Sequence, residues 1–192
     1  MFKKLILIIK IFSFYFLSIN TSFADLQNNL INKLTKIQTL TFDFRQKIAD
    51  KEEVGICYIK YPLMMKCNYE NHKKKTIISN GKTVAIIKKK YKKVYLYPIK
   101  STPLIFILKK EKIINLIKNS NPDEIDKNLI SYKFVDKKKN IVSIIFDKKS
   151  LNLRGWETKD AYSNNVIFEI NNLVINNQIV DNFFRIPREE NL

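Results

Sequence analysis

The sequence predicts a mainly β protein with some α-helix, in which an antiparallel sheet of about eleven strands curls and helices cover its concave face. From Leu40 onward, apolar and polar residues alternate with a period of two in successive runs, as in half-buried strands. Short turns join these runs, which favours antiparallel neighbours. Helical patterns occur in residues 25–39 and 102–120, the two segments available to cover a concave face.

Residues 1–24 have the layout of a cleavable secretory signal. The positive start MFKK precedes a mostly apolar stretch, and Ser22 and Ala24 occupy the small-residue positions that a signal peptidase recognises. A membrane anchor is the alternative, but the uncharged stretch 11–19 is shorter than the about 20 residues that a span needs. We expect cleavage after Ala24, where no cysteine is present to carry a lipid, and location in the periplasm.

Residues 25–192 are then a single domain, long enough to bury a core. Loss of the three lysines of the leader lowers the formal net charge from +17 to +14. A charge of this size suggests an anionic partner. Only four of the 35 basic residues are arginines, and Ile, Asn and Lys are all heavily used, so a solvated lysine surface is an equally good interpretation.

The first half of the domain is predicted to be one helix followed by six strands. Apolar residues recur at helical spacing from Leu26 to Ile37, and Asp25 is placed to cap that helix. The pair Asn80-Gly81 predicts a tight hairpin turn. The expected strands are residues 41–49, 54–61, 65–70, 74–79, 82–88 and 91–97.

A helical insert and five more strands follow. The segment STPLIFILKK places Thr102 as an N-cap and Pro103 at the first helical position, ahead of an apolar block with no polar face. This block is either an ordinary buried helix or a lid over an apolar pocket, and residues 112–120 predict a second short helix. The later strands are expected at residues 129–136, 140–147, 151–160, 165–173 and 178–186, with Pro187 ending the last.

The sequence marks no catalytic centre, so we expect no enzymatic activity, no cofactor and no metal site. His72, the only histidine, stands in a polar turn beside lysines, with no acid or nucleophile marked as its partner. The spacing of Cys57, Cys67 and His72 fits no compact zinc pattern. The acidic run PDEID is typical of a helix start or a turn rather than of paired catalytic carboxylates.

Three lysine runs, at residues 73–75, 88–90 and 137–139, fall at expected strand ends and turns. With tyrosines between them they resemble a nucleic-acid surface, but the secretory leader argues against nucleic acid as a partner. An anionic membrane or lipopolysaccharide surface is the better functional interpretation. Charged strand edges that prevent aggregation of the sheet are the alternative.

Short motifs in a fixed order make the domain resemble the LolA family of periplasmic lipoprotein carriers. After the N-terminal helix come a Phe-x-Gln strand, a glycine seven residues before a proline, a basic residue with following aromatics, a Ser-Asp-Gly turn, a Thr-Pro lid and a Phe-x-x-Pro ending. The matching residues are Phe44, Arg45 and Gln46; Gly55, Pro62, Lys66, Cys67 and Tyr69; Ser79, Asn80 and Gly81; Thr102, Pro103, Leu104, Phe106 and Leu108; and Phe184, Arg185, Ile186 and Pro187.

The resemblance implies an incomplete, strongly curved antiparallel β-barrel with a short helical lid over an apolar cavity. It further implies a monomeric carrier that receives acylated lipoproteins from an inner-membrane ABC transporter of the LolCDE type. Delivery to the outer membrane often uses a receptor of the same fold. A lipid- or lipoprotein-sensing module without transport is the alternative. Carriage is needed because a long acyl chain exposed to water costs on the order of 10 kcal/mol.

The acyl chains of the cargo are expected to contact apolar side chains on alternate strand positions and on the lid. The expected cavity residues are Phe42, Phe44, Ile59, Tyr61, Met65, Tyr69, Val84, Ile86, Leu104, Phe106 and Leu108. Some positions depart from the family pattern. Tyr61 stands where members usually have an inward arginine that bonds to the lid. Cys67 replaces an aromatic residue, and Ala85 and Ile86 stand where an aromatic residue follows the turn.

The only two cysteines, Cys57 and Cys67, flank Pro62, and strand alternation places both on one face. If the turn between them has an odd number of residues they lie opposite each other, with Cβ atoms about 4.5–5.5 Å apart. An oxidising compartment permits a disulfide there, while two free cysteines in the core are the alternative.

Overall fold

The computed structural model describes residues 20–70, 74–135, 141–160 and 162–192. Most of the predicted leader, His72 and the lysine run 137–139 lie outside these residues. The helices are α2 (Asn20–Lys36), α3 (Leu104–Leu108) and α4 (Lys110–Asn119), and the short 3-10 turns are η1 (Lys89–Tyr91), η2 (Ile99–Ser101), η3 (Asp181–Phe184) and η4 (Glu189–Asn191). The strands are β1 (Thr39–Ile48), β2 (Lys51–Lys60), β3 (Met64–Tyr69), β4 (Lys75–Asn80), β5 (Thr83–Lys88), β6 (Lys93–Pro98), β7 (Asp123–Glu124), β8 (Leu129–Val135), β9 (Ile141–Asp147), β10 (Leu153–Lys159) and β11 (Asn165–Ile175).

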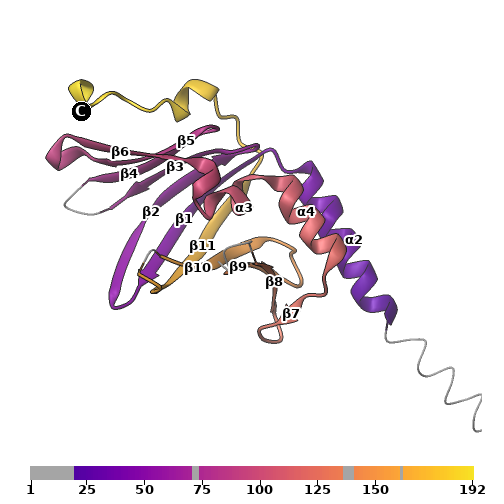
Figure 1. Ribbon diagram of the computed structural model, residues 1–192. Coiled ribbons are helices and arrows are strands. Elements are labelled where there is room, and N and C mark those ends of the chain that lie inside the picture. Colours follow the sequence, from indigo (N-terminus) through magenta and orange to yellow (C-terminus); the bar gives the residue numbers. More distant parts are fainter. Residues whose placement is uncertain (1–19, 71–73, 136–140, 161) are drawn as a thin grey trace, which may run out of the picture.

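The eleven strands of the described residues form one antiparallel sheet, in the order β6-β5-β4-β3-β2-β1-β11-β10-β9-β8-β7. The chain runs outward from β1 to the edge strand β6, crosses to the other edge at β7, and returns strand by strand until β11 pairs with β1. The sheet curves strongly and stays open between β6 and β7 (Figure 1). The predicted fold class, mainly β with α and an incomplete curved antiparallel barrel, is therefore confirmed.

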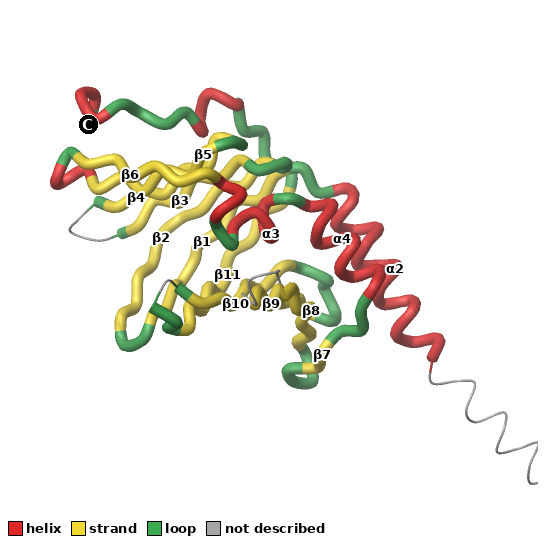
Figure 2. Tube along the Cα trace, in the orientation of Figure 1, coloured by secondary structure: helices red, strands yellow, loops and turns green. Residues whose placement is uncertain are grey.

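The crossing from β6 to β7 carries α3 and α4 to the concave side of the sheet (Figure 2). There α4 packs beside α2, and a side chain of each helix donates hydrogen bonds to backbone carbonyls at the C-terminal end of the other. Gln27 of α2 donates to the carbonyl of Ser120 at 2.8 Å, and Lys110 of α4 donates to the carbonyl of Ile37 at 2.7 Å. These contacts satisfy polar groups that helix ends leave open, so they fix the two helices against each other.

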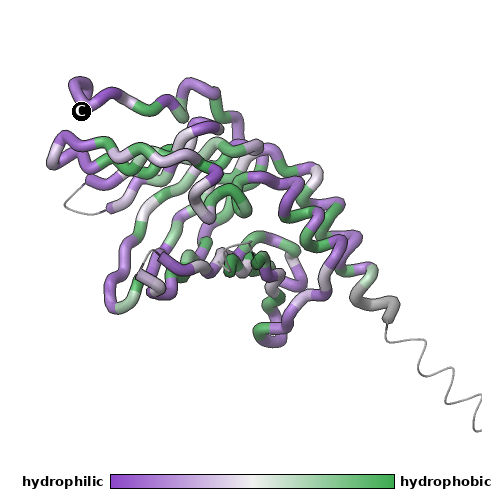
Figure 3. The backbone as a smooth tube through the Cα atoms, in the orientation of Figure 1, coloured by the Kyte–Doolittle hydropathy of each residue, from purple (hydrophilic) through white to green (hydrophobic). Residues whose placement is uncertain are grey.

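The core is divided between the two faces of the sheet. The larger part fills the concave side and joins α2, α3 and α4 to inward residues of both sheet halves. Hydrophobic residues predominate along α3 and the strands β8 and β9, whereas hydrophobic and hydrophilic residues alternate along α2 and α4 (Figure 3). The smaller part lies on the outer face, where Ile78, Ala85 and Ile87 pack against Phe184 of the chain's C-terminal segment, residues 176–192.

The prediction of a strand at residues 178–186 is wrong, because the structure has no strand there. This stretch contains the turn η3 between extended residues and lies over the outer face of the sheet. The topology accounts for part of this: β11 already pairs with β1 on one side and β10 on the other, so the segment that follows it cannot add a strand beside β11. Lys60 instead anchors the segment, through the carbonyl of Ile179 at 2.8 Å and the carboxylate of Asp181 at 2.6 Å.

Two predicted helix starts also differ from the structure. Helix α2 begins at Asn20, so Asp25 lies in its second turn and does not cap it. Pro103, not Thr102, is the N-cap residue of α3. Thr102 is extended and its hydroxyl donates to the carbonyl of Ile99 at 2.9 Å, which closes the preceding turn η2 and leaves no side-chain cap on α3.

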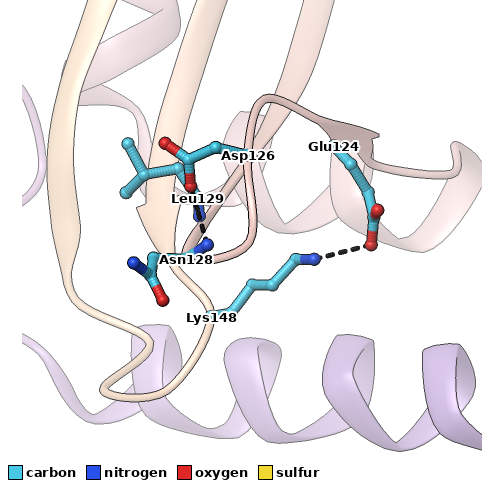
Figure 4. Close-up of polar contacts among 5 residues, drawn as sticks. All are labelled: Glu124, Asp126, Asn128, Leu129 and Lys148. Carbon is cyan, nitrogen blue, oxygen red and sulfur yellow. Dashed lines mark hydrogen bonds and ion pairs between the residues drawn. The ribbon is translucent and has the colours of Figure 1, made fainter.

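The acidic run PDEID forms the edge strand β7 and the turn after it (Figure 4). Glu124 pairs with Lys148 at 2.6 Å. Asp126 accepts hydrogen bonds from the backbone N–H groups of Asn128 and Leu129, at 2.7 and 2.9 Å. The run therefore begins no helix: Asp123 and Glu124 form β7, and only its last residues enter the predicted turn, where the carboxylates shape the β7–β8 hairpin.

Candidate functional site

A row of aromatic rings crosses the concave face of the sheet. Trp156 of β10 stacks on Phe168 of β11, with ring centroids 4.0 Å apart, and Phe168 stacks on Phe44 of β1 at 4.7 Å. Phe44 then meets Tyr69 of β3 edge to face at 4.8 Å. Such pairs contribute about 0.5–1.5 kcal/mol each beyond the area they bury, so the row is a rigid apolar floor.

Gly55 allows the aromatic row to pass over β2. It is the cross-strand partner of both Phe44 and Tyr69, and therefore lies directly between them. A Cβ atom at this position would stand 2.9 Å from the ring of Phe44 and 2.0 Å from the carbonyl oxygen of Asn68. Only glycine leaves room for the two rings to touch across the intervening strand.

A cavity of about 320 Å³ lies between the floor and α3. This volume falls in the range of about 300–1,000 Å³ that small-ligand sites occupy. Its wall combines residues of the two halves of the sheet, β1–β6 and β7–β11. Its roof is formed by α3 and the two residues before it, Thr102 and Pro103. The lining residues are Gln46, Ile48, Met65, Cys67, Tyr69, Ile77, Val84, Ile86, Tyr97, Thr102, Pro103, Leu104, Ile107, Trp156, Thr158, Lys159, Asp160, Val166 and Phe168.

The roof helix α3 is attached to both halves of the sheet. The backbone N–H of Leu63, in the β2–β3 turn, donates to the carbonyl of Leu108 at 2.9 Å. On the other side, the ring of Phe106 lies 4.9 Å from that of Phe134 in β8. The helix therefore bridges the opening of the curved sheet, and Leu104 and Ile107 form part of the cavity roof.

The structure distributes the eleven predicted cavity residues between two layers. Met65, Tyr69, Val84, Ile86 and Leu104 line the cavity. The others lie in the core around it: Phe42, Phe44, Ile59, Tyr61, Phe106 and Leu108. Their contact with acyl chains stays a prediction.

Sequence reasoning missed the second half of the cavity wall. Trp156, Thr158, Val166 and Phe168 come from β10 and β11, which the sequence identifies as strands. Alternation within each strand separates these residues from their neighbours, but it does not tell which face is concave. The pairing of β11 with β1 decides this.

Tyr61 stands where the family's arginine would be, and it does not line the cavity. It is partly buried in the core beside the helices, and its peptide bond to Pro62 is cis. The ammonium of Lys110 lies 5.7 Å from the centroid of its ring. Burial raises the pKa of the Tyr61 phenol, so the side chain is neutral at physiological pH. Contact between the β2–β3 turn and the lid runs instead through the backbone of Leu63.

Cys57 and Cys67 are directly opposite in β2 and β3, and their sulfur atoms are bonded. The two Cα atoms are 4.1 Å apart, the short spacing of a non-hydrogen-bonded antiparallel pair. Both side chains face inward, and Cys67 lines the cavity beside Met65 and Tyr69. The bridge thus joins the two strands at the position where the family's aromatic residue is absent.

Few polar groups face the cavity. Tyr69 donates its hydroxyl hydrogen bond to the side-chain oxygen of Gln46. Burial, and secondarily the negative charge of Glu53, raise the pKa of Tyr69. The hydroxyl of Thr158 is buried and has no hydrogen-bond partner among the described residues. The Thr158 hydroxyl could therefore form a hydrogen bond with the polar end of an amphipathic ligand.

Within the described residues, no three His, Cys, Asp or Glu side chains lie close enough together to hold a metal ion. Across the same part of the chain, no helix has the length and apolar character required to cross a bilayer. The residues that line the cavity offer apolar contact and a few hydrogen-bonding groups at its wall.

Comparison with solved structures shows the fold in other proteins. The chain is similar to an uncharacterized conserved protein from Thermus thermophilus, with a TM-score of 0.50 and 8% identity over 85% of this chain and 94% of that one. LprF from Mycobacterium bovis gives a TM-score of 0.50 and 10% identity, over 88% and 98% of the two chains. A LolA superfamily protein from Nitrosomonas europaea gives 0.43 and 8%, over 83% and 97%.

The comparison with curated proteins gave no significant match. A family model covers most of the chain: the model of the outer membrane lipoprotein carrier protein LolA matches residues 35–187. The match includes the whole sheet, the lid helix α3 and the aromatic floor, and this family is one of carriers rather than enzymes. The chain therefore belongs to the LolA family.

Proposed function

We propose that the protein is a periplasmic carrier, which shields the acyl chains of lipoproteins in its cavity and moves them from the inner to the outer membrane. The single observation that carries the proposal is the apolar cavity of about 320 Å³ between the aromatic floor and α3. A carrier must hold a chain that water rejects by about 0.8 kcal/mol per methylene. It must also release that chain, and a roof formed by the five-residue helix α3 is suited to opening.

The partners in this proposal are acylated lipoproteins, an inner-membrane ABC transporter that releases them, and a receptor at the outer membrane. The protein acts as a monomer. Cleavage after Ala24 delivers it to the periplasm, where the bridge between Cys57 and Cys67 is stable. Sequencing the N-terminus of the exported protein tests the location, and Asp25 is the expected first residue.

The carrier role is tested by placing a charge in the cavity. Met65 is 2% exposed and lines the cavity wall, so Met65→Glu forces a carboxylate against the acyl chain. Desolvating that charge costs several kcal/mol, which exceeds the free energy gained by the few acyl methylenes that contact this position. Transfer of a labelled lipoprotein from inner-membrane vesicles to the variant, and onward to outer membranes, should fall by at least about tenfold.

Two further variants make the result interpretable. Leu104→Glu changes the roof, where the side chain is partly buried, and should impair transfer even if Met65→Glu folds poorly. Lys47→Glu adds a carboxylate at an exposed position of β1 and should transfer normally. Lys60 is unsuitable as this control because it anchors the C-terminal segment. Normal transfer by folded Met65→Glu and Leu104→Glu proteins would place the cargo elsewhere, whereas binding without onward delivery would favour a sensing module.

A further inference from the structure

A second pocket lies on the outer face of the sheet, and Tyr69 is the one described residue that lines both it and the apolar cavity. It has a volume of about 560 Å³ and is enclosed by β3, β4, the turn after β5 and the C-terminal segment. Five cationic side chains line it, and among the described residues no carboxylate does: Lys66, Lys74, Lys75, Lys89 and Arg185. These cations come from β3, the start of β4, the turn η1 and the C-terminal segment, which the fold brings together.

The positive charges in this pocket are incompletely balanced. Lys75 forms an ion pair with Glu53. Lys66 is fixed by the C-terminal segment, with its ammonium 4.2 Å from the centroid of the Phe183 ring. Burial, and secondarily the positive charge of Lys89, lower the pKa of Lys66, which shows that like charges oppose each other here. A bound anion would remove this repulsion.

The groups that could bind an anion are exposed to the pocket. Lys89 lies in the turn η1 and Arg185 follows η3, and both side chains are exposed. Neither side chain makes a hydrogen bond or ion pair with another residue in the described ranges. Arginine offers a planar pair of donors to phosphate oxygens, and lysine adds a point charge. Buried Ile78 and Ile87 supply an apolar floor to the pocket.

We propose that this outer pocket binds a phosphate-bearing organic anion, with the phosphate between Lys66, Lys89 and Arg185 and the adjoining carbon atoms on the isoleucine floor. A phospholipid headgroup and a soluble organophosphate share this chemistry. Among the described residues only Tyr69 lines both this pocket and the apolar cavity, and none of the three cations in the proposal lines the cavity, so the proposal does not rest on the carrier role.

The test measures binding of two probes to the full-length protein by titration calorimetry. One probe is glycerol phosphate, and the other is phosphatidylcholine vesicles prepared with and without phosphatidylglycerol. We expect saturable binding of at least one probe, which Lys89→Gln/Arg185→Gln weakens by about tenfold or more because two charge-assisted contacts are lost. Neither residue has a described side-chain partner, so the fold should be retained, and thermal unfolding checks this.

The control variant is Lys47→Gln/Lys118→Gln, which removes the same two charges at exposed positions outside the pocket. It should bind both probes as the unmodified protein does. Binding of glycerol phosphate without binding to phosphatidylglycerol vesicles would identify a soluble ligand, and binding of phosphatidylglycerol vesicles, with or without glycerol phosphate, would identify a lipid headgroup. Equal weakening in the two double variants, or no saturable binding of either probe, would overturn the proposal, because net charge and not the pocket would then govern association.

Discussion

The backbone N–H of Leu63 donates a hydrogen bond of 2.9 Å to the carbonyl of Leu108, which joins the β2–β3 turn to the last residue of the lid helix α3. Ser79 supports the same turn, since its hydroxyl donates to the carbonyl of Leu63 at 2.6 Å. Leu108 itself is fully buried. The lid is therefore held at its C-terminal end and free of a side-chain cap at its N-terminal end.

Leu108 and Leu104 of α3 differ in burial, so truncating each side chain should change stability by a different amount. Leu108→Ala empties a buried site and should lower the free energy of unfolding by about 2–5 kcal/mol. Leu104 is only partly buried and lines the cavity, so Leu104→Ala should cost about 1 kcal/mol and act mainly on ligand affinity. Urea denaturation of both variants measures the difference, and equal losses would contradict the deeper burial of the Leu108 side chain.

Reduction of the Cys57–Cys67 bridge should destabilise the protein. The bridge closes a short loop, with a sequence separation of 10, and a loop of this size contributes about 2–3 kcal/mol in the chain-entropy model. Urea denaturation with and without reductant measures the change. A Cys57→Ala/Cys67→Ala protein is the control and should not respond to reductant. Detection of two alkylatable thiols in unreduced protein by mass analysis would contradict the pairing.

Two threonine hydroxyls should respond oppositely to replacement by valine. The Thr158 hydroxyl is buried without a partner among the described residues, so Thr158→Val should raise the free energy of unfolding by about 1 kcal/mol. The Thr76 hydroxyl donates to the side-chain oxygen of Asn68 at 3.3 Å, and Thr76→Val should lower stability by a similar amount, about 1 kcal/mol. Thermal unfolding checks both, and a loss of stability in Thr158→Val would show that its hydroxyl is bonded.

Stability should fall at alkaline pH because of Tyr69. Its pKa is raised in the folded protein by burial and by the charge of Glu53, so the neutral phenol is favoured by folding. The resulting stabilisation is complete below the ordinary tyrosine pKa of about 10 and is lost as pH rises from there toward the folded value. In urea denaturation at increasing pH, Tyr69→Phe should show a shallower loss than the unmodified protein.

Tyr162 provides the matched control for this pH dependence, because its side chain is 87% exposed. Tyr162→Phe should follow the alkaline profile of the unmodified protein. If Tyr69→Phe also follows that profile, other groups govern the alkaline transition, and the burial of Tyr61 makes Tyr61→Phe the next variant to measure.

Local sequence patterns were sufficient for most of the individual elements. The Asn80-Gly81 turn is present, with Gly81 at a φ of +95° and the Asn80 side chain accepting from the N–H of Thr83 at 2.9 Å. Alternation correctly placed Met65 on the inner face, because strand side chains reverse face at every residue. The same alternation placed both cysteines on the inner face.

The sequence by itself thus determined the strand periodicity, the turns, the helices and the family motifs, all of which depend on neighbours within a few residues. Tertiary structure decided what depends on pairing between distant segments. The β1–β11 pairing joined Phe168 and Trp156 to Phe44 and completed the cavity floor. Side-chain contacts with distant strands likewise placed residues 178–186, a segment with the composition of a strand, over the outer face of the sheet, where Phe184 packs on Ile78 and Ile87 and Arg185 lines the cationic pocket.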